Sequence, residues 1–103
     1  MSTTTDIRAL NAIALAIWQG ITPAQRAALR RARPHGLGLR LTWSTNARVI
    51  SALVVRGLVT AEKSMHTSRV FYPVTVAGLL VLEVGQAHEA KQAKRKYAQR
   101  GES

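Results

Sequence analysis

Apolar residues recur at helical spacing near the start of the chain, between Asp6 and Gln19. Ile7, Leu10 and Ile17 fall on one stripe of this predicted helix, the spacing typical of a face that packs against other elements. Further apolar side chains spread well beyond this stripe, so one buried face does not account for all of them. Two alternatives follow: a helix at the centre of the core, or a helix covered in part by a second subunit.

A second helix is predicted from its start signal. Thr22 can cap the helix, Pro23 suits its first turn, and Gln25 can reach back to the capping residue. The helix is expected to end near Arg33, because Pro34 disfavours helical geometry in the residue before it. Its arginines form either a solvated basic face or a set of phosphate contacts, and both interpretations stay open.

Alternation of apolar and polar residues from Leu37 to Trp43 predicts a short, half-buried strand. Pro34, Gly36 and Gly38 precede or open it, and we interpret them as loop and strand-entry residues. The strand is expected to complete a three-stranded sheet with a later hairpin. Trp43 is expected to fill a place in the core, the usual role of a large aromatic side chain.

Helix and strand signals follow each other in the middle of the chain. A helix from Ser44 to Arg56, capped by Ser44, is stopped by Gly57. Two β-prone runs, residues 58–62 and 69–74, surround a polar and basic link, which predicts a hairpin. A helix followed by such a hairpin is typical of a DNA-reading helix with a wing beside it.

A last helix is predicted to open at Thr75. It either continues through Gly85 into the basic C-terminal segment or stops there and leaves a basic tail. We therefore divide the chain into a domain of residues 1–85 and a basic helix or tail of residues 86–103. This terminal segment is expected to contact phosphates, to extend a dimer helix, or only to keep the protein in solution.

Composition narrows the class of protein. Among 103 residues, 15 Lys and Arg stand against 5 Asp and Glu, which gives a net charge of +10 and an isoelectric point near 11.6. This balance favours a polyanionic partner, most often nucleic acid and sometimes an acidic membrane surface. The absence of cysteine excludes disulfides and thiolate chemistry. Because no apolar run reaches the roughly 20 residues of a membrane span, we expect a cytoplasmic protein without membrane contact.

The sequence carries no signal of an enzyme. The acidic residues and the 3 histidines are scattered, and none forms a metal-ligand spacing or an acid–base pair. A Gly-rich phosphate loop is also missing. We therefore predict no catalytic residues, no cofactor and no metal site.

The predicted central helix carries the candidate DNA-reading surface. A step of about 100° per residue puts Ala47, Ile50, Leu53 and Val54 on its inward arc. Small and hydrogen-bonding side chains occupy the outward arc and first turn, which suits base-edge reading, although many exposed helix faces are simply polar. In the wing, residues 60–72, basic side chains near the tip would meet the DNA backbone or minor groove. The predicted DNA-binding residues are Thr45, Asn46, Arg48, Ser51, Ala52, Arg56, Lys63, His66 and Arg69.

Together these segments resemble winged helix-turn-helix regulators of the MarR and PadR type. The resemblance covers residues 21–84 and rests on ITPAQRAALRRA, STNARVISALVVRGLV and YPVTVAGLLVLE. It implies a mainly helical α+β fold with a three-helix core, a small antiparallel sheet with a wing hairpin, and a C-terminal helix. It also implies that the helix ending in RGLV reads DNA. Only residues 33–43 separate the second and third helices, so either ITPAQRAALRRA is the first helix of the motif with a long turn, or the motif is remodelled.

The expected function is sequence-specific binding of double-stranded DNA by a transcriptional regulator that acts as a repressor at the nucleoid. Excess apolar surface on the first and last helices predicts a homodimer through these helices. A chain this short leaves little room for a ligand pocket, so no small-molecule effector is expected. The alternative is a winged helix that serves as a protein-interaction or RNA-binding module, because a fold does not determine a function.

Overall fold

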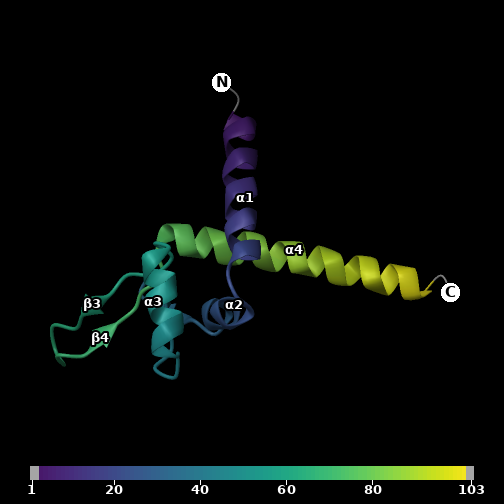
Figure 1. Ribbon diagram of the computed structural model, residues 1–103. Coiled ribbons are helices and arrows are strands. Elements are labelled where there is room, and N and C mark those ends of the chain that lie inside the picture. Colours follow the sequence, from purple (N-terminus) through teal and green to yellow (C-terminus); the bar gives the residue numbers. More distant parts are fainter. Residues whose placement is uncertain (1–2, 102–103) are drawn as a thin grey trace.

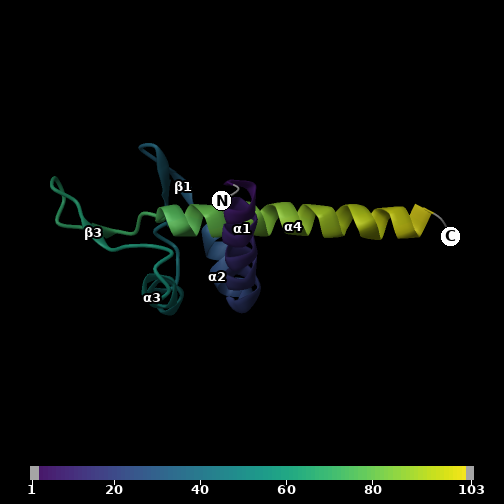
Figure 2. The same cartoon turned by 90° about the horizontal axis from the view of Figure 1, so that it is seen from above.

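Helices dominate the computed structural model, which describes the backbone of residues 3–101 and the side chains of residues 6–96. The helices in this range are α1 Thr3–Gly20, α2 Pro23–Arg30, α3 Ala47–Val55 and α4 Val76–Gly101. The strands are β1 Arg33–His35, β2 Gly38–Arg40, β3 Glu62–Lys63 and β4 Val70–Phe71. Figures 1 and 2 show that α1 crosses α4, and that α1 and the second half of α4 project from a body made by the other elements.

The core lies where the end of α1 meets α2, α3 and the first half of α4. Trp18, Leu29, Leu53 and Val81, one from each helix, are at most 2% exposed. Leu58, which follows α3, is buried with them. Each of these side chains contributes roughly 1.5–3 kcal/mol by leaving water, so their contact holds the helices together.

Gly85 lies in the middle of α4, against the ring of Trp18. A Cβ atom at Gly85 would come within 2.1 Å of the indole, so only glycine lets the ring pack directly on the α4 backbone. Of the two alternatives for the last helix, the structure shows the continuous one, because α4 runs through this position to Gly101. The division of the chain at residue 85 stays a prediction, and it falls inside a single helix.

Local signals determine the start of α2, as expected. The N–H of Gln25 donates to Thr22 Oγ1 at 3.2 Å, and the N–H of Thr22 donates to the Gln25 side chain at 3.2 Å, which completes a capping box. The predicted end near Arg33 is wrong, since the last helical residue is Arg30. The helix ends early because Arg33 already pairs with Arg40 in a β-hairpin.

β1 and β2 form this hairpin. β2 lies within the strand predicted from Leu37 to Trp43, whereas β1 lies where the sequence indicates a loop. Arg33 pairs with Arg40, and the turn between the strands is Gly36–Leu37. Gly36 has a φ of +59°, a conformation that favours glycine. The interpretation of Pro34 as a loop residue is therefore wrong, since it lies in β1. Pro34 is tolerated there because, in the described residues, β1 pairs on one side only.

Residues 72–74 pair with the end of β2 on one side and with the segment after α3 on the other. On the first side, the N–H of Leu41 donates to the carbonyl of Tyr72 at 2.9 Å. On the second side, the N–H of Thr60 donates to the carbonyl of Pro73 at 3.0 Å. This is the three-stranded arrangement expected from the sequence, in a short form.

α3 begins later than predicted and ends where predicted. Asn46 is its N-cap, because the Asn46 side-chain oxygen accepts a hydrogen bond from the N–H of Arg48 at 2.8 Å. The prediction of Ser44 as the cap is wrong, since Ser44 lies in a turn with its hydroxyl 3.1 Å from that of Thr42. Gly57, with a φ of +75°, ends the helix as expected.

The wing hairpin consists of β3 and β4 with residues 64–69 between them. Glu62 pairs with Phe71, and Lys63 pairs with Val70. The paired strands are shorter than the predicted wing of residues 60–72, because the ends of that range already pair in the three-stranded sheet.

Thr75 joins the end of α3 to the start of α4. Its hydroxyl oxygen accepts from the N–H of Gly78 at 3.0 Å, which makes Thr75 the predicted cap, and its hydroxyl donates to the Gly57 carbonyl at 2.7 Å. A Cβ atom at Gly78 would lie 2.1 Å from the Leu58 carbonyl oxygen, so the two segments touch backbone to backbone. These contacts determine how α3 is presented relative to α4.

The complete arrangement is a mainly helical α+β winged helix with a small antiparallel sheet and a wing, and the C-terminal helix α4 adds to the core that three helices were expected to form. α2 packs directly on α3, and the β1–β2 hairpin lies between these two helices in the chain. This is the arrangement that a helix-turn-helix with a long turn would have. Among the described residues, no helix combines the length and the apolar character that crossing a membrane requires.

Candidate nucleic-acid interface

The exposed face of α3 is centred on Ser51. Arg48, Ser51 and Val55 are exposed, and Val55 retains 86% of its surface. Ala47 and Val54 are exposed as well, so the prediction that they face inward is wrong. A row of small and hydrogen-bonding side chains therefore faces solvent along α3.

The buried face of α3 explains why Ala47 and Val54 face outward and not inward as predicted. Leu53 is fully buried, and Val49 and Ile50 pack against the core beside it. Val49 buries more apolar surface than Ala47 would, so the helix turns Val49 inward and Ala47 outward. Ala52 lies at the border between the two faces and is half-buried, which makes it less available than predicted.

Two predicted residues at the start of α3 also have structural roles. The hydroxyl of Thr45 lies 3.3 Å from that of Thr42, and Thr45 is half-buried. The side-chain oxygen of Asn46 serves the helix cap, while Asn46 itself is exposed. Its amide NH₂ can therefore still donate hydrogen bonds to an external acceptor.

Arg48 and Arg56 provide positive charge at opposite ends of α3. Both side chains are exposed, and within residues 6–96 neither forms a salt bridge. Arg48 shares the exposed face with Ser51, whereas Arg56 is the C-cap residue. A guanidinium group without an internal acidic partner keeps its donors for a ligand.

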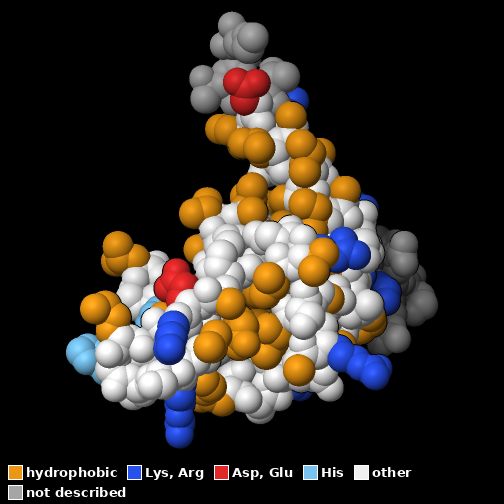
Figure 3. Space-filling model, turned by 60° about the vertical axis from the view of Figure 1, so that its left-hand side comes forward, with side chains coloured by type: hydrophobic (Ala, Val, Ile, Leu, Met, Phe, Trp, Pro, Cys, Tyr) orange, Lys and Arg blue, Asp and Glu red, His pale blue; other side chains and the backbone are white. Residues whose placement is uncertain are grey.

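The wing places Lys63, His66 and Arg69 in solvent. Figures 1 and 2 show that the wing and α3 lie at the same end of the body, away from the projecting parts of α1 and α4. The space-filling view shows Lys and Arg side chains on the wing and the lower part of the body, and hydrophobic side chains along α1 (Figure 3). The fold therefore brings the two predicted groups, on α3 and on the wing, to one end of the molecule.

The arginines of α2 divide between internal contacts and solvent. Arg30 forms a salt bridge with Glu89 of α4, whose other carboxylate oxygen accepts from Trp18 Nε1 at 3.3 Å. Arg26 Nε donates to the Trp18 carbonyl at 2.9 Å, so it ties α2 to the end of α1. Arg26 is thus used in an internal contact, whereas Arg30 and Arg31 are exposed, so both interpretations of the basic face stay open for them.

The prediction that Trp43 fills a place in the core is wrong, because 61% of its surface is exposed. The Arg40 and Arg69 guanidinium carbons lie 5.4 and 6.0 Å from the centre of its ring. The rings of His35 and Phe71 are in contact beside them, with their centres 5.0 Å apart. These five residues line a cleft of about 170 Å³ between the β1–β2 hairpin and the wing, which we call the Trp43 cleft. The polar neighbours of Trp43, in the sequence TWST, are the signal that could have indicated its exposure.

A second cavity, of about 360 Å³, lies between α2 and the start of α3. Alanines from α2 and hydroxyl groups from residues 42–45 line it. Within the described residues, His, Asp and Glu do not gather in groups of three or more that could hold a metal ion. The absence of a small-molecule effector stays a prediction.

Comparison with known proteins gives a likeness of fold. No protein-family model matches the sequence, and neither does any curated protein. Among solved structures, the chain is similar to the crystal structure of a probable transcriptional regulator from Pseudomonas aeruginosa, with a TM-score of 0.59 and 23% sequence identity. The similarity covers 94% of this chain and 84% of that chain.

Proposed function

We propose that this protein is a transcriptional regulator that binds double-stranded DNA in a sequence-specific manner and acts as a repressor. The observation that carries this proposal is the exposed face of α3, where Arg48 and Ser51 stand among small side chains beside a basic wing. The fold shared with a probable transcriptional regulator and the resemblance to MarR and PadR proteins support it. A protein with this function works at the nucleoid, in the cytoplasm.

α3 has the dimensions and side chains of a helix that reads the major groove. Its 9 residues span about 14 Å, and the major groove is about 12 Å wide. Arg48 can donate two hydrogen bonds to a guanine, and Ser51 can bond either a donor or an acceptor. Ala47 and Val55 are small enough to allow close approach and can contact thymine methyl groups. Asn46, Arg56 and the edge residues Thr45 and Ala52 complete the proposed reading surface.

The wing supplies contacts that do not depend on sequence. Lys63, His66 and Arg69 would meet phosphates or the minor groove on the flank of the site that α3 reads. The net charge of +10 favours this mode, since phosphate contacts provide most of the affinity for any duplex. Arg48 should therefore determine sequence preference, whereas the wing should determine affinity.

A homodimer is the second part of the proposal. Ile7, Leu10 and Ile13 of α1 are 53–59% exposed on a helix that projects from the body (Figures 1 and 3). Covering side chains of this kind yields up to about 1.5–3 kcal/mol each, which a second copy of the chain would provide together with α4. A twofold dimer would bind two half-sites about 10–10.5 base pairs apart, or a multiple of this spacing.

Selection of bound duplexes from a randomised library, followed by fluorescence anisotropy at several salt concentrations, tests the proposal. We expect a preferred, partly palindromic sequence and a log–log salt slope of about −0.9 for each phosphate contacted. Absence of duplex binding at low salt would overturn the proposal. Binding of structured RNA, or of a protein, in place of duplex DNA would favour the interaction-module alternative.

A further inference from the structure

The Trp43 cleft lies between the β1–β2 hairpin and the wing, and it shares Arg69 with the proposed phosphate contacts of the wing. It is formed by the β1–β2 hairpin on one side and β4 with the wing link on the other. Arg69 belongs to the predicted wing contacts, whereas no binding role is predicted for the other residues of the cleft. A role for the cleft rests on the proposed function, since it names Arg40, Trp43 and Arg33 as further contacts to the same duplex.

One face of the β1–β2 hairpin is basic. The register places Arg33 directly opposite Arg40, and His35 directly opposite Gly38. Directly opposed residues share a face of the hairpin, as do residues two apart in one strand, so Arg33, His35 and Arg40 all lie on this face. Like charges directly opposite each other are destabilising, unless an anion is bound between or beside them.

The two arginines of the cleft are held by an aromatic ring and not by acidic groups. Arg40 and Arg69 both lie within 6.0 Å of the centre of the Trp43 ring. Within residues 6–96, none of the arginines at positions 33, 40 and 69 forms a salt bridge. An arginine that stacks on an aromatic face keeps its N–H donors directed outward in one plane, the geometry that matches two phosphate oxygens.

We propose that the Trp43 cleft is a clamp for one phosphodiester group of duplex DNA, with Arg40 and Arg69 as its two arms. Trp43 positions both guanidinium groups against their mutual repulsion, and Arg33 adds positive charge from the neighbouring strand. The β1–β2 hairpin therefore contacts the DNA backbone next to the wing. A phosphate suits the cleft better than a nucleobase, because two guanidinium groups within 6.0 Å of the ring centre supply positive charge and paired N–H donors.

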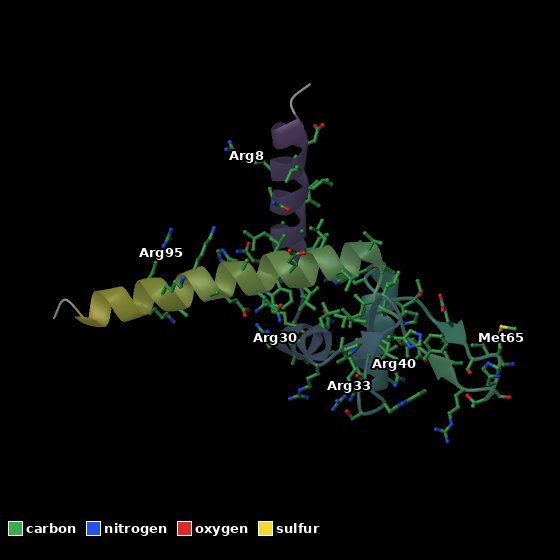
Figure 4. The ribbon with its side chains drawn as sticks, turned by 180° about the vertical axis from the view of Figure 1, so that it is seen from behind. Arg8, Arg30, Arg33, Arg40, Met65 and Arg95 are labelled. Carbon is green, nitrogen blue, oxygen red and sulfur yellow. The ribbon has the colours of Figure 1, made fainter. Side chains whose placement is uncertain are left out.

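The test measures binding of the intact protein to one duplex by fluorescence anisotropy over a range of salt concentrations. Arg40→Ala should weaken binding by about tenfold and reduce the salt slope by about 0.9, to the same extent for all duplex sequences. Arg8→Ala is the matched control, because it removes the same charge from α1, far from Arg40 (Figure 4). This control should leave the slope unchanged.

Trp43→Ala separates positioning from charge, since it leaves the net charge as it is. It should weaken duplex binding about threefold to tenfold, and Trp43→Phe should restore most of the loss. Iodide quenching gives an independent readout, because Trp43 is 61% exposed and Trp18 is 2% exposed. Duplex DNA should reduce the quenching of Trp43 fluorescence by iodide in the wild type. The Trp43→Phe variant should show no iodide-quenchable tryptophan fluorescence. Circular dichroism melts establish that each variant is folded.

Three results would overturn the clamp. If Arg40→Ala and Trp43→Ala bind like Arg8→Ala while Arg48→Ala loses sequence preference, the clamp is wrong and the proposed function stands. If Trp43→Ala weakens binding to a single-stranded oligonucleotide and not to the duplex, the cleft stacks bases instead. If the wild type binds no duplex at low salt, the clamp and the proposed function fail together.

Discussion

Replacing Gly85 with alanine should destabilise the protein, although alanine is the better helix former. Propensity alone favours alanine by about 1 kcal/mol in a helix interior. At this position, however, the new Cβ would lie within 2.1 Å of the Trp18 ring. Forcing an extra methyl group into a packed core costs about 1–3 kcal/mol, and this overlap is severe enough to belong at the upper end.

Trp18 has little freedom to relieve the overlap. Its ring is 2% exposed, and its Nε1 donates to Glu89 at 3.3 Å. The Arg26 and Arg30 guanidinium carbons lie 5.9 and 5.1 Å from the centre of the ring. We therefore expect a net loss of about 1–2 kcal/mol, which for a chain of this size lowers Tm by roughly 5–15 °C.

Gly20→Ala is the matched control for this prediction. Gly20 also lies in a helix, at the last residue of α1, and a Cβ atom there would meet nothing within 4 Å. The same substitution should therefore be neutral or stabilising by up to about 1 kcal/mol. Thermal melts followed by circular dichroism at one protein concentration compare the two variants, because dimerisation makes Tm depend on concentration.

A double-mutant cycle identifies the cause. If the Trp18 ring is the obstacle, Trp18→Phe should cost less in the Gly85→Ala background than in the wild type, because the smaller ring leaves room for the methyl group. Gly85→Ala melting at or above the wild-type temperature would refute the packing of α1 on the α4 backbone. A strictly additive cycle would attribute the loss to another contact.

The remaining predictions concern DNA, the dimer and the ion pair. Arg48→Ala should reduce the preference for the selected site over a random duplex by about 1–3 kcal/mol, with the affinity for the random duplex nearly unchanged. Equal losses of affinity for the two duplexes in anisotropy would show that Arg48 does not read bases. Leu10→Asp should yield monomers in light scattering at micromolar concentration. Met65→Asp, at the wing residue labelled in Figure 4, is the control and should leave the dimer intact. A monomeric wild type would contradict the proposed dimer. Glu89→Gln removes the ion pair between Arg30 and Glu89, whose side chains are 39% and 38% exposed respectively. It should lower the free energy of unfolding in urea by about 0.5–1 kcal/mol, and by less at high salt.

Signals that act over a few residues could be read from the sequence. The capping box at Thr22 and Gln25, the stop at Gly57 and the cap at Thr75 all involve partners at most four positions away. Their geometry depends mainly on the local backbone, so the residue types are sufficient to predict it. The order of the helices and of the wing strands was predictable in the same way, whereas β1 was interpreted as a loop.

The candidate site was predictable in outline and not in detail. Arg48 and Ser51 are exposed on α3 as expected, but the arc of the helix is rotated, so that Ala47 replaces Ala52 on the outer face. Which of two neighbouring apolar residues turns inward depends on the space that other elements leave. That space is not encoded in the helix itself.

The exposure of Trp43 also could not be predicted from the alternation of apolar and polar residues. Period-two alternation continues the strand through Trp43, which predicts a buried ring, but the chain turns at residues 43–45 and carries the ring out of the sheet. The partners of Trp43 then come from β2 and from the wing, 3 and 26 positions away in the printed sequence. Only the pairing of the hairpins brings these groups together.

The order of the helices and the wing, the caps at Thr22 and Thr75 and the excess of positive charge could be predicted from the sequence, because they depend on neighbours along the chain and on composition. Tertiary structure alone decided the phase of α3, the role of Gly85 beneath Trp18, the internal use of Arg26, and the assembly of the Trp43 cleft. These features join residues from separate elements, and their geometry follows from how the whole core packs. Local propensity carries no information about such distant contacts.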